Sequence, residues 1–311
     1  MIRQLLWLLQ ALLFFCGTWL ITLLPERFVN PVGSGVGLLM YRLLSRRRRI
    51  AEDNVAKSFG YMRVQPGWNC SIPDAAGIVR EVFRNIGRSL VETCRLYHGR
   101  GDRLINRIEM RGKQHYQAAR AQGKGLIFLA GHCANWELGA LGFGRLLQTP
   151  VSAVARRQDN PYLNRMVERM RMRYDNQVIY KDQALRQMLG VIRKNGVVGL
   201  LVDQAVLPSE GTLIQFLGRS AWATKAPVVL ARRTGAPVLP VFAHREQDRL
   251  VIEILPELVF NGNADDQSLA EDVQRYSRII EEWIVRHPTD WYWVHRRWKR
   301  TEGLADAGTV L

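Results

Sequence analysis

The hydrophobic pattern of the chain begins with a long apolar stretch. Residues 4–25 (QLLWLLQALLFFCGTWLITLLP) contain no charged side chain. As a helix they would extend about 33 Å, which is enough to cross the hydrocarbon core of a bilayer. The stretch runs into Pro-Glu-Arg and not into a small-residue cleavage site, so we predict a retained membrane anchor over residues 1–25 instead of a signal peptide. A buried core helix and a re-entrant or surface-lying helix remain alternatives.

The region from residue 26 to 122 shows mainly helical patterns. An apolar, glycine-rich stretch predicts a helix over 28–45, and a helix with basic and polar residues follows it. Pro73 and Asp74 open a further helix that runs to about Tyr97. We expect these helices to form a membrane-proximal region that precedes the first strand.

Beyond residue 123 the pattern changes to short β-rich runs that alternate with helical ones. Continuous apolar runs such as VVGLLVD are typical of strands that are covered on both faces. The alternation predicts an α/β fold over residues 123–300, with a layered, mixed and largely parallel sheet flanked by helices. Residues 301–311 are expected to form a flexible tail. The expected strands are 125–130, 151–155, 177–180, 197–203, 212–218, 236–243 and 250–255.

Composition limits the classes of protein that fit. Of the 311 residues, 47% are hydrophobic and 23% are charged, which indicates a globular protein and argues against a disordered chain or a polytopic membrane protein. The chain has 44 Lys and Arg against 28 Asp and Glu, a formal charge of +16. Such a surface attracts nucleic acid, anionic lipid head groups or an acidic partner protein. The arginines at 46–49 follow the anchor and, if the anchor spans, place the body of the protein in the cytoplasm.

Polar and reactive side chains follow three of the expected strands. GHCANWE comes after the first strand, ARRQDNP after the second and VDQ after the fourth. In layered α/β folds, functional groups gather where strands end and helices begin. If the three strands are parallel, these groups meet at one edge of the sheet.

His132 and Glu137 bracket the first of these segments. Residues five apart would lie on different faces of a continuous helix, so we expect His132 in the strand–helix turn and Glu137 in the first helical turn. There the carboxylate can reach one ring nitrogen, and the other nitrogen is free to act as a general base on a substrate hydroxyl. Backbone N–H groups at the helix start would favour a developing oxyanion. The alternative is a loop histidine beside a glutamate that only complements the helix dipole.

Cys133 is a rival nucleophile. A thiol beside a histidine at a helix N-terminus can have a lowered pKa. Adjacent side chains usually point apart, however, and no separate histidine stands out as its base, so we expect Cys133 to be non-catalytic. The cysteines Cys16, Cys70, Cys94 and Cys133 are scattered without a Cys-x-x-Cys pair, which argues against a zinc cluster and a disulfide framework.

Five sequence blocks, in order along the chain, resemble one protein family. GHCANWELG resembles the His-x4-Asp/Glu motif of the glycerolipid acyltransferase superfamily, and its Asn-Trp-Glu form resembles the bacterial lipid A late acyltransferases of the lauroyl and myristoyl type. The resemblance covers nearly the whole chain. The other blocks are RRRRIAEDNVAKSF, ARRQDNPYLNRMVERMR, GVVGLLVDQ with GTLIQFLGRSAWATKAPVVLARRTGAPVLPVF, and HPTDWYWVHRRWKR.

The resemblance implies an O-acyltransferase of the bacterial inner membrane, with a single anchor and a catalytic body on the cytoplasmic face. It implies an acyl carrier protein thioester as the donor and a hydroxyl of a phosphorylated glycolipid, the lipid A precursor, as the acceptor. His132 is then the general base and Glu137 its orienting partner. The matching motif positions for substrate contacts are Asn135, Trp136, Arg156, Arg157, Asp203, Gln204, Thr224 and Lys225.

Other functions remain open at this point. The acceptor could be a lysophospholipid or an amino-acid lipid, or the chain could be a non-catalytic, membrane-anchored lipid-binding protein. Nucleic-acid binding is not expected, because no DNA- or RNA-binding motif accompanies the positive charge. We also expect no metal and no cofactor, since the sequence has no GxGxxG, Walker or HExxH pattern.

Overall fold

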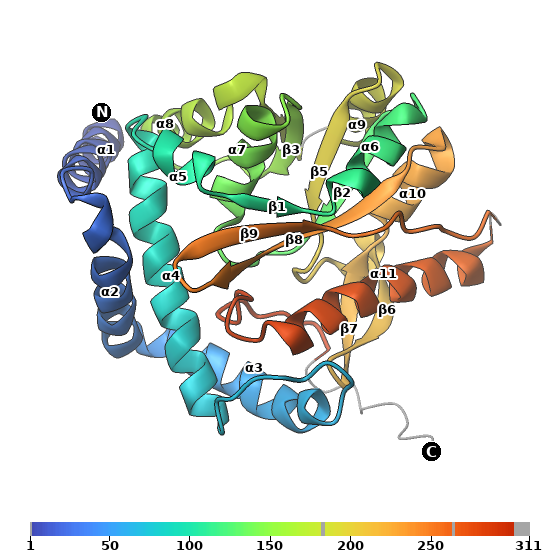
Figure 1. Ribbon diagram of the computed structural model, residues 1–311, viewed down its shortest axis with the longest axis horizontal. Coiled ribbons are helices and arrows are strands. Elements are labelled where there is room, and N and C mark those ends of the chain that lie inside the picture. The colour runs from blue at the N-terminus through green and yellow to red at the C-terminus, as the bar shows by residue number, and fades with distance from the viewer. Residues whose placement is uncertain (1, 182–183, 263–264, 302–311) are drawn as a thin grey trace.

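A seven-stranded sheet forms the centre of the molecule (Figure 1). The computed structural model describes residues 2–181, 184–262 and 265–301. The strand order is β1-β9-β8-β2-β5-β3-β4, and neighbouring strands are parallel apart from the antiparallel β8–β9 pair. This sheet confirms the predicted α/β fold. Its strands are β1 (Glu109–Arg111), β2 (Leu126–Ala130), β3 (Val151–Ala155), β4 (Gln177–Tyr180), β5 (Val197–Leu201), β8 (Val238–Glu246) and β9 (Arg249–Ile254).

Helices cover both faces of this sheet, because alternate side chains of each strand point to opposite sides. Ile127 and Leu129 of β2 share a core with α9, α10 and α11 on one face. Leu126 and Phe128 share a second core with α6, α7 and α8 on the other face. The helices of the two layers are α6 (Lys113–Ala121), α7 (Trp136–Leu146), α8 (Pro161–Arg171), α9 (Ala184–Arg193), α10 (Ala226–Thr234) and α11 (Asp266–Arg286).

Two features of the strands differ from the prediction. β1 lies in the region that we expected to be helical, because an alternating Glu-Met-Arg triplet is too short to reveal a period of two. The strand expected over 212–218 is present as β6 (Gly211–Phe216), but it pairs with β7 (Arg219–Thr224) in a separate antiparallel hairpin. The sequence therefore predicted β6 as a strand but not its place outside the main sheet.

Helices α1, α2 and α4 lie side by side next to the sheet (Figure 1). The carboxylate of Asp74 caps α4 by accepting a hydrogen bond from the Gly77 N–H at 2.6 Å, which is the predicted helix start. α2 and α4 pack backbone against backbone, since a Cβ atom at Gly37 would lie 2.1 Å from the Phe83 carbonyl oxygen. This close approach explains the glycine-rich sequence of α2. The first five helices are α1 (Ile2–Ile21), α2 (Val29–Leu43), α3 (Ser45–Arg63), α4 (Ala75–Tyr97) and α5 (Asp102–Asn106).

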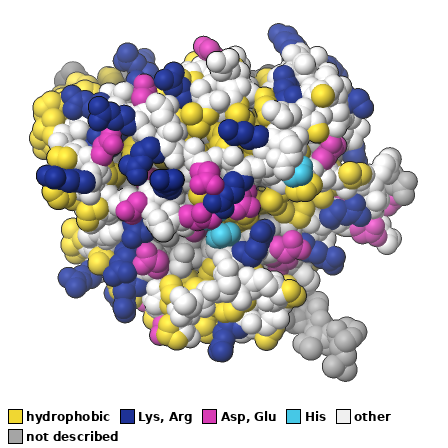
Figure 2. All heavy atoms as spheres, viewed as in Figure 1, with side chains coloured by type: hydrophobic (Ala, Val, Ile, Leu, Met, Phe, Trp, Pro, Cys, Tyr) yellow, Lys and Arg dark blue, Asp and Glu magenta, His cyan; other side chains and the backbone are white. Residues whose placement is uncertain are grey.

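Helix α1 presents an apolar surface to the outside. It is long and apolar enough to span a membrane, and 11% of its most apolar window is buried. One side packs on the body: the Thr18 hydroxyl lies 2.8 Å from His98 Nε2, and the Asn160 amide donates to the Trp7 carbonyl at 2.8 Å. The other side projects leucines outward. Figure 2 shows this apolar edge, with Lys and Arg side chains spread across the same face of the molecule.

Candidate active site

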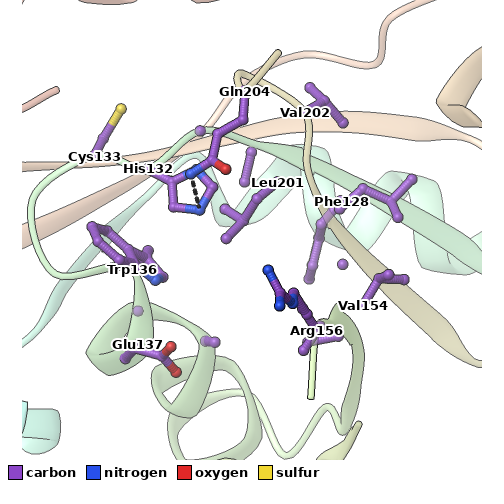
Figure 3. Close-up of a pocket in the computed structure, with 18 of the residues that line it drawn as sticks. Phe128, His132, Cys133, Trp136, Glu137, Val154, Arg156, Leu201, Val202 and Gln204 are labelled. Atoms are coloured by element: carbon purple, nitrogen blue, oxygen red, sulfur yellow. Dashed lines mark hydrogen bonds between the residues drawn. The ribbon is translucent and has the colours of Figure 1, made fainter. Parts of the chain in front are cut away.

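Three parallel strands bring the predicted groups to one pocket. β2, β5 and β3 are neighbours in the sheet and run in the same direction, so the residues that follow them lie at one edge. His132 follows β2, Arg156 follows β3 and Gln204 follows β5, and all three line a pocket of about 790 Å³. Figure 3 shows their side chains around one open space, together with Trp136 and Glu137. The structure thus produces the convergence that the sequence predicted.

Asp203 holds the ring of His132. Its Oδ1 lies 2.7 Å from His132 Nδ1, and its Oδ2 accepts hydrogen bonds from the His132 backbone N–H at 2.9 Å and the Trp291 indole N–H at 2.7 Å. Burial alone would raise the pKa of this carboxyl, but His132 and these hydrogen bonds outweigh it and lower the pKa to about 2. The ionised carboxylate accepts the Nδ1 proton, so in the neutral imidazole the lone pair is on Nε2.

The second ring nitrogen of His132 faces Gln204. The amide nitrogen of Gln204 lies 3.2 Å from His132 Nε2 and can donate a hydrogen bond to it. Trp136 packs edge-on against the imidazole, with the ring centroids 4.9 Å apart. A neutral imidazole held in this way can accept a proton from a hydroxyl that binds in the pocket.

Glu137 makes a different contact from the one that we expected. Its carboxylate pairs with Arg171 of α8: Arg171 Nε lies 3.0 Å from Glu137 Oε2, and Nη2 bonds to Oε1. The first turn of α7 directs Glu137 toward α8, whereas Asp203 lies at the end of the strand beside β2. The expected orienting contact with His132 is therefore corrected, because it is made by Asp203, which lies 71 residues further along the chain.

A buried polar network fixes the turn between β2 and α7. Asn135 caps α7, since its Oδ1 accepts the Leu138 N–H at 3.1 Å. Its Nδ2 donates to Glu92 at 2.8 Å, and Glu92 pairs with Arg245 through contacts of 2.7 and 2.8 Å. The Glu92 and Arg245 side chains are 6% and 4% exposed. Asn135 therefore lies behind the pocket wall, where it supports the backbone that carries His132.

The segment 290–297, which follows α11, completes the site. The Ala134 N–H donates to the Asp290 carbonyl at 2.7 Å, and the Tyr292 N–H donates to the His132 carbonyl at 3.0 Å. Ala134 has a φ of 46°, a left-handed conformation that these contacts help to hold. The turn that carries His132 is thus held between the buried network on one side and this segment on the other.

The remaining predicted contacts divide between the pocket and its surroundings. Trp136, Arg156 and Thr224 line the pocket. Arg157 lies over the ring of Tyr180, with its guanidinium carbon 4.0 Å from the ring centroid. Lys225 is the N-cap residue of α10. Within the described ranges, these last two side chains are not part of the pocket lining.

Sequence reasoning missed Arg171 and Trp291 as residues of the site. Trp291 was visible in the last sequence block, but its spacing gave no sign that the indole reaches Asp203. Arg171 is the last residue of α8, and basic residues in a last helical turn are typical of a solvated helix end. Both contacts depend on the tertiary fold.

Cys133 is buried beneath the turn, with 1% of its surface exposed. Burial, with Asp203 and Asp290 nearby, raises the pKa of its thiol well above 9. A thiol that stays protonated is a poor nucleophile. The geometry therefore favours the expectation that Cys133 is non-catalytic.

The pocket has an apolar interior and a charged rim. Phe128, Phe143 and Val151 line its inner part, along the face of the sheet that α7 covers. The rim carries the exposed basic residues Arg156, Lys181, Lys299 and Arg300. An apolar interior with a basic mouth fits a molecule that combines a hydrocarbon chain with an anionic head group.

Comparison with known proteins identifies relatives of this chain. Residues 3–300 match the family model of bacterial lipid A biosynthesis acyltransferases. The chain is 28% identical over 292 residues to the lipid A biosynthesis lauroyltransferase of Escherichia coli (strain K12), with 92% of this chain and 90% of that protein covered. It is 26% identical over 282 residues to the lipid A biosynthesis palmitoleoyltransferase of the same organism, with 90% and 88% covered. Among solved structures, the 1-acyl-sn-glycerophosphate acyltransferase of Thermotoga maritima is similar with a TM-score of 0.37 and 15% identity, covering 80% of this chain and 97% of that one.

Proposed function

The chain belongs to the bacterial lipid A biosynthesis acyltransferases, and we propose that it moves a fatty acyl chain from an acyl carrier protein thioester to a hydroxyl of a phosphorylated glycolipid, the lipid A precursor. The observation that carries this proposal is the His132–Asp203 pair at the mouth of an apolar pocket with a basic rim. The interior suits a hydrocarbon chain, and the rim attracts both the acceptor phosphates and an acidic carrier protein.

His132 acts as the general base in this proposal. Its Nε2 takes the proton of the acceptor hydroxyl while the hydroxyl oxygen attacks the thioester carbonyl carbon. The carbon–sulfur bond then breaks, and the leaving thiolate takes the proton back from the imidazolium. Asp203 stabilises that imidazolium through its 2.7 Å contact with Nδ1. The Gln204 amide, which lies 3.2 Å from Nε2, is placed to donate to the oxyanion of the tetrahedral intermediate.

Glu137 and Arg171 act as a positioning pair. Both side chains line the pocket and are mostly buried, 16% and 25% exposed. Their paired contacts join α7 to α8 and so fix the pocket wall that faces His132. An arginine held in this way keeps N–H groups for an anionic oxygen of the substrate.

Helix α1 and the arginines at 46–49 provide two membrane signals. The exposed leucines of α1 supply apolar contact, and the basic cluster attracts anionic head groups. Inner-membrane association with the catalytic body on the cytoplasmic face follows from the positive-inside tendency.

The test is a transfer assay with full-length protein in detergent. Mixed-length acyl carrier protein thioesters and a lipid A precursor are supplied, and the lipid products are weighed by mass spectrometry. We expect the acceptor to gain the mass of one acyl chain, the gain to vanish in His132→Ala, and His115→Ala on α6 to retain it.

Parallel arms separate the alternatives. Acyl-coenzyme A replaces the carrier thioester in one arm, and a lysophospholipid or an amino-acid lipid replaces the acceptor in others. Transfer to one of these acceptors and none to the lipid A precursor would replace the proposed acceptor. Lipid binding without transfer in every arm would favour the non-catalytic alternative.

A further inference from the structure

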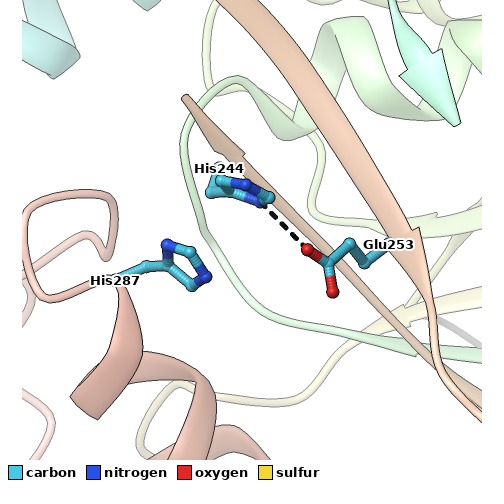
Figure 4. A group of neighbouring side chains, drawn as sticks. All are labelled: His244, Glu253 and His287. Carbon is cyan, nitrogen blue, oxygen red and sulfur yellow. Dashed lines mark ion pairs between the residues drawn. The ribbon is translucent and has the colours of Figure 1, made fainter. Parts of the chain in front are cut away.

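A second group of ionisable side chains lies at the β8–β9 hairpin. His244 of β8, Glu253 of β9 and His287 at the C-cap of α11 place their ligand atoms within 4.8 Å of one another (Figure 4). Glu253 pairs across the hairpin with Phe242, so it lies on the same face of the sheet as His244. Among the residues that the structure describes, the three are separate from the lining of the active-site pocket.

Glu246 sets the tautomer of His244. The Nε2 atom of His244 lies 3.0 Å from Glu246 Oε1. The same carboxylate binds the Arg111 guanidinium through two contacts of 2.6 and 2.7 Å, which keep it ionised. A carboxylate accepts and cannot donate, so Nε2 carries a proton, and in the neutral imidazole the lone pair is on Nδ1.

The Nδ1 atom of His244 is buried without a hydrogen-bond partner in the described part of the chain. The side chain is 2% exposed. The Oε1 atom of Glu253 faces Nδ1 at 3.9 Å, which is too long for a hydrogen bond. The Arg111 guanidinium also lies 3.9 Å from this Oε1 atom. When Nδ1 carries a lone pair, it and Oε1 are two electron-pair donors that face each other, and a cation bound between them would remove their repulsion.

The spacing of these atoms is close to that of metal ligands. Two ligands that bind one Zn²⁺ ion at about 2.1 Å in a tetrahedral arrangement lie about 3.4 Å apart. Small side-chain movements therefore bring Nδ1 and the Glu253 carboxylate onto one ion. His287 has a ring nitrogen within 4.8 Å of the other ligand atoms. Its ring stacks on that of His244, with centroids 4.2 Å apart and planes at 28°, so it must rotate about its side-chain bonds to direct that nitrogen at the same ion.

We propose that His244 Nδ1, the Glu253 carboxylate and a ring nitrogen of His287 bind one zinc ion, with water as the fourth ligand. Two imidazoles and a carboxylate are a ligand set typical of Zn²⁺. The hydrogen bond from His244 Nε2 to Glu246 matches the carboxylate–histidine–metal arrangement that orients metal ligands.

The ion would have a structural role at the start of the segment that completes the active site. It would join the end of α11 to the β8–β9 hairpin through His287. The Asp290 N–H donates to the His287 carbonyl at 3.1 Å, and the Asp290 carbonyl accepts the Ala134 N–H at 2.7 Å. Zinc binding would therefore stiffen the connection between this hairpin and the turn that carries His132.

Zinc titration of the full-length protein in detergent tests the site. The protein is stripped with a chelator, and Zn²⁺ is titrated in competition with a chromophoric zinc chelator. We expect one tightly bound ion per chain and a thermal unfolding midpoint that rises with zinc. Glu253→Gln and His287→Asn should each weaken binding by more than about tenfold and remove the rise in the midpoint. His115→Asn on α6 is the matched control and should change neither quantity.

Wild-type protein that binds zinc no better than the two variants would overturn the proposal. Full zinc affinity in Glu253→Gln would also overturn the proposal. In that case a proton on His244 Nδ1, and not a zinc ion, would face Glu253. The Glu253 side chain is partly exposed, and glutamine preserves its size, so Glu253→Gln should fold. Its zinc affinity therefore tests the proposal even where His287→Asn fails to fold. The result is independent of acyl transfer, because the readouts are metal content and unfolding temperature.

Discussion

Replacing Asp203 with asparagine should reverse the tautomer of His132. In the native protein one carboxylate oxygen accepts the Nδ1 proton, and the other accepts two N–H groups, from the His132 backbone and the Trp291 indole. An asparagine has a single acceptor oxygen. The backbone and indole N–H groups are two donors, whereas Nδ1 offers one. The asparagine oxygen should therefore face these two N–H groups, and its NH₂ group should donate to Nδ1. Nε2 then carries the proton and cannot act as a base.

The expected changes in stability and in kcat can each be given a magnitude. The pKa of Asp203 falls from 3.8 to about 2, which corresponds to roughly 2 kcal/mol in favour of the ionised form. A base held in the wrong tautomer should lower kcat by roughly 10³–10⁴-fold, as in other histidine–carboxylate pairs. Because the folded pKa lies below the unfolded value, the stabilisation is present above about pH 4 and is lost as the pH falls toward 2. The stability deficit of Asp203→Asn should therefore be largest at neutral pH.

Steady-state acyl transfer and denaturant unfolding, both followed as a function of pH, measure these effects. Asp248→Asn in the exposed β8–β9 turn is the matched control and should retain wild-type kcat and stability. An Asp203→Asn enzyme that is folded and keeps kcat within about tenfold of the wild type would refute the assignment of Asp203 as the partner of His132.

Three further predictions follow from the contacts around the site. Glu137→Ala and Arg171→Ala should each lower kcat/KM by roughly 10²-fold, and the double variant should lose little more, because the pair acts as a unit; additive losses would contradict this. Cys133→Ala should keep about half or more of the transfer rate, since its thiol is buried and protonated, and a folded but inactive variant would make the thiol essential. Glu92→Gln should lower the free energy of unfolding by about 3–5 kcal/mol by leaving the buried Arg245 charge unpaired, and a loss below about 1 kcal/mol in urea unfolding would argue against that account.

The sequence predicted where the site forms better than which side chains pair within it. The apolar runs of β2, β3 and β5 indicated buried parallel strands, and that topology alone brings His132, Arg156 and Gln204 to one edge. The partner of His132 could not be predicted in the same way. Spacing favours a nearby carboxylate such as Glu137, whereas the true contact depends on β5 lying beside β2. The Trp291 contact depends on the path of the chain after α11, for which local patterns carry no information.

The segment 290–297 makes completion of the His132 turn a late event in synthesis. Helix α1 is synthesised before the sheet, whereas the indole and the backbone groups that contact the His132 turn come from residues near the other end of the described chain. A nascent chain that has reached residue 289 already holds His132 and Asp203 but lacks the residues that fix them. The apolar helix α1 is therefore synthesised long before the residues that hold the His132 turn in place.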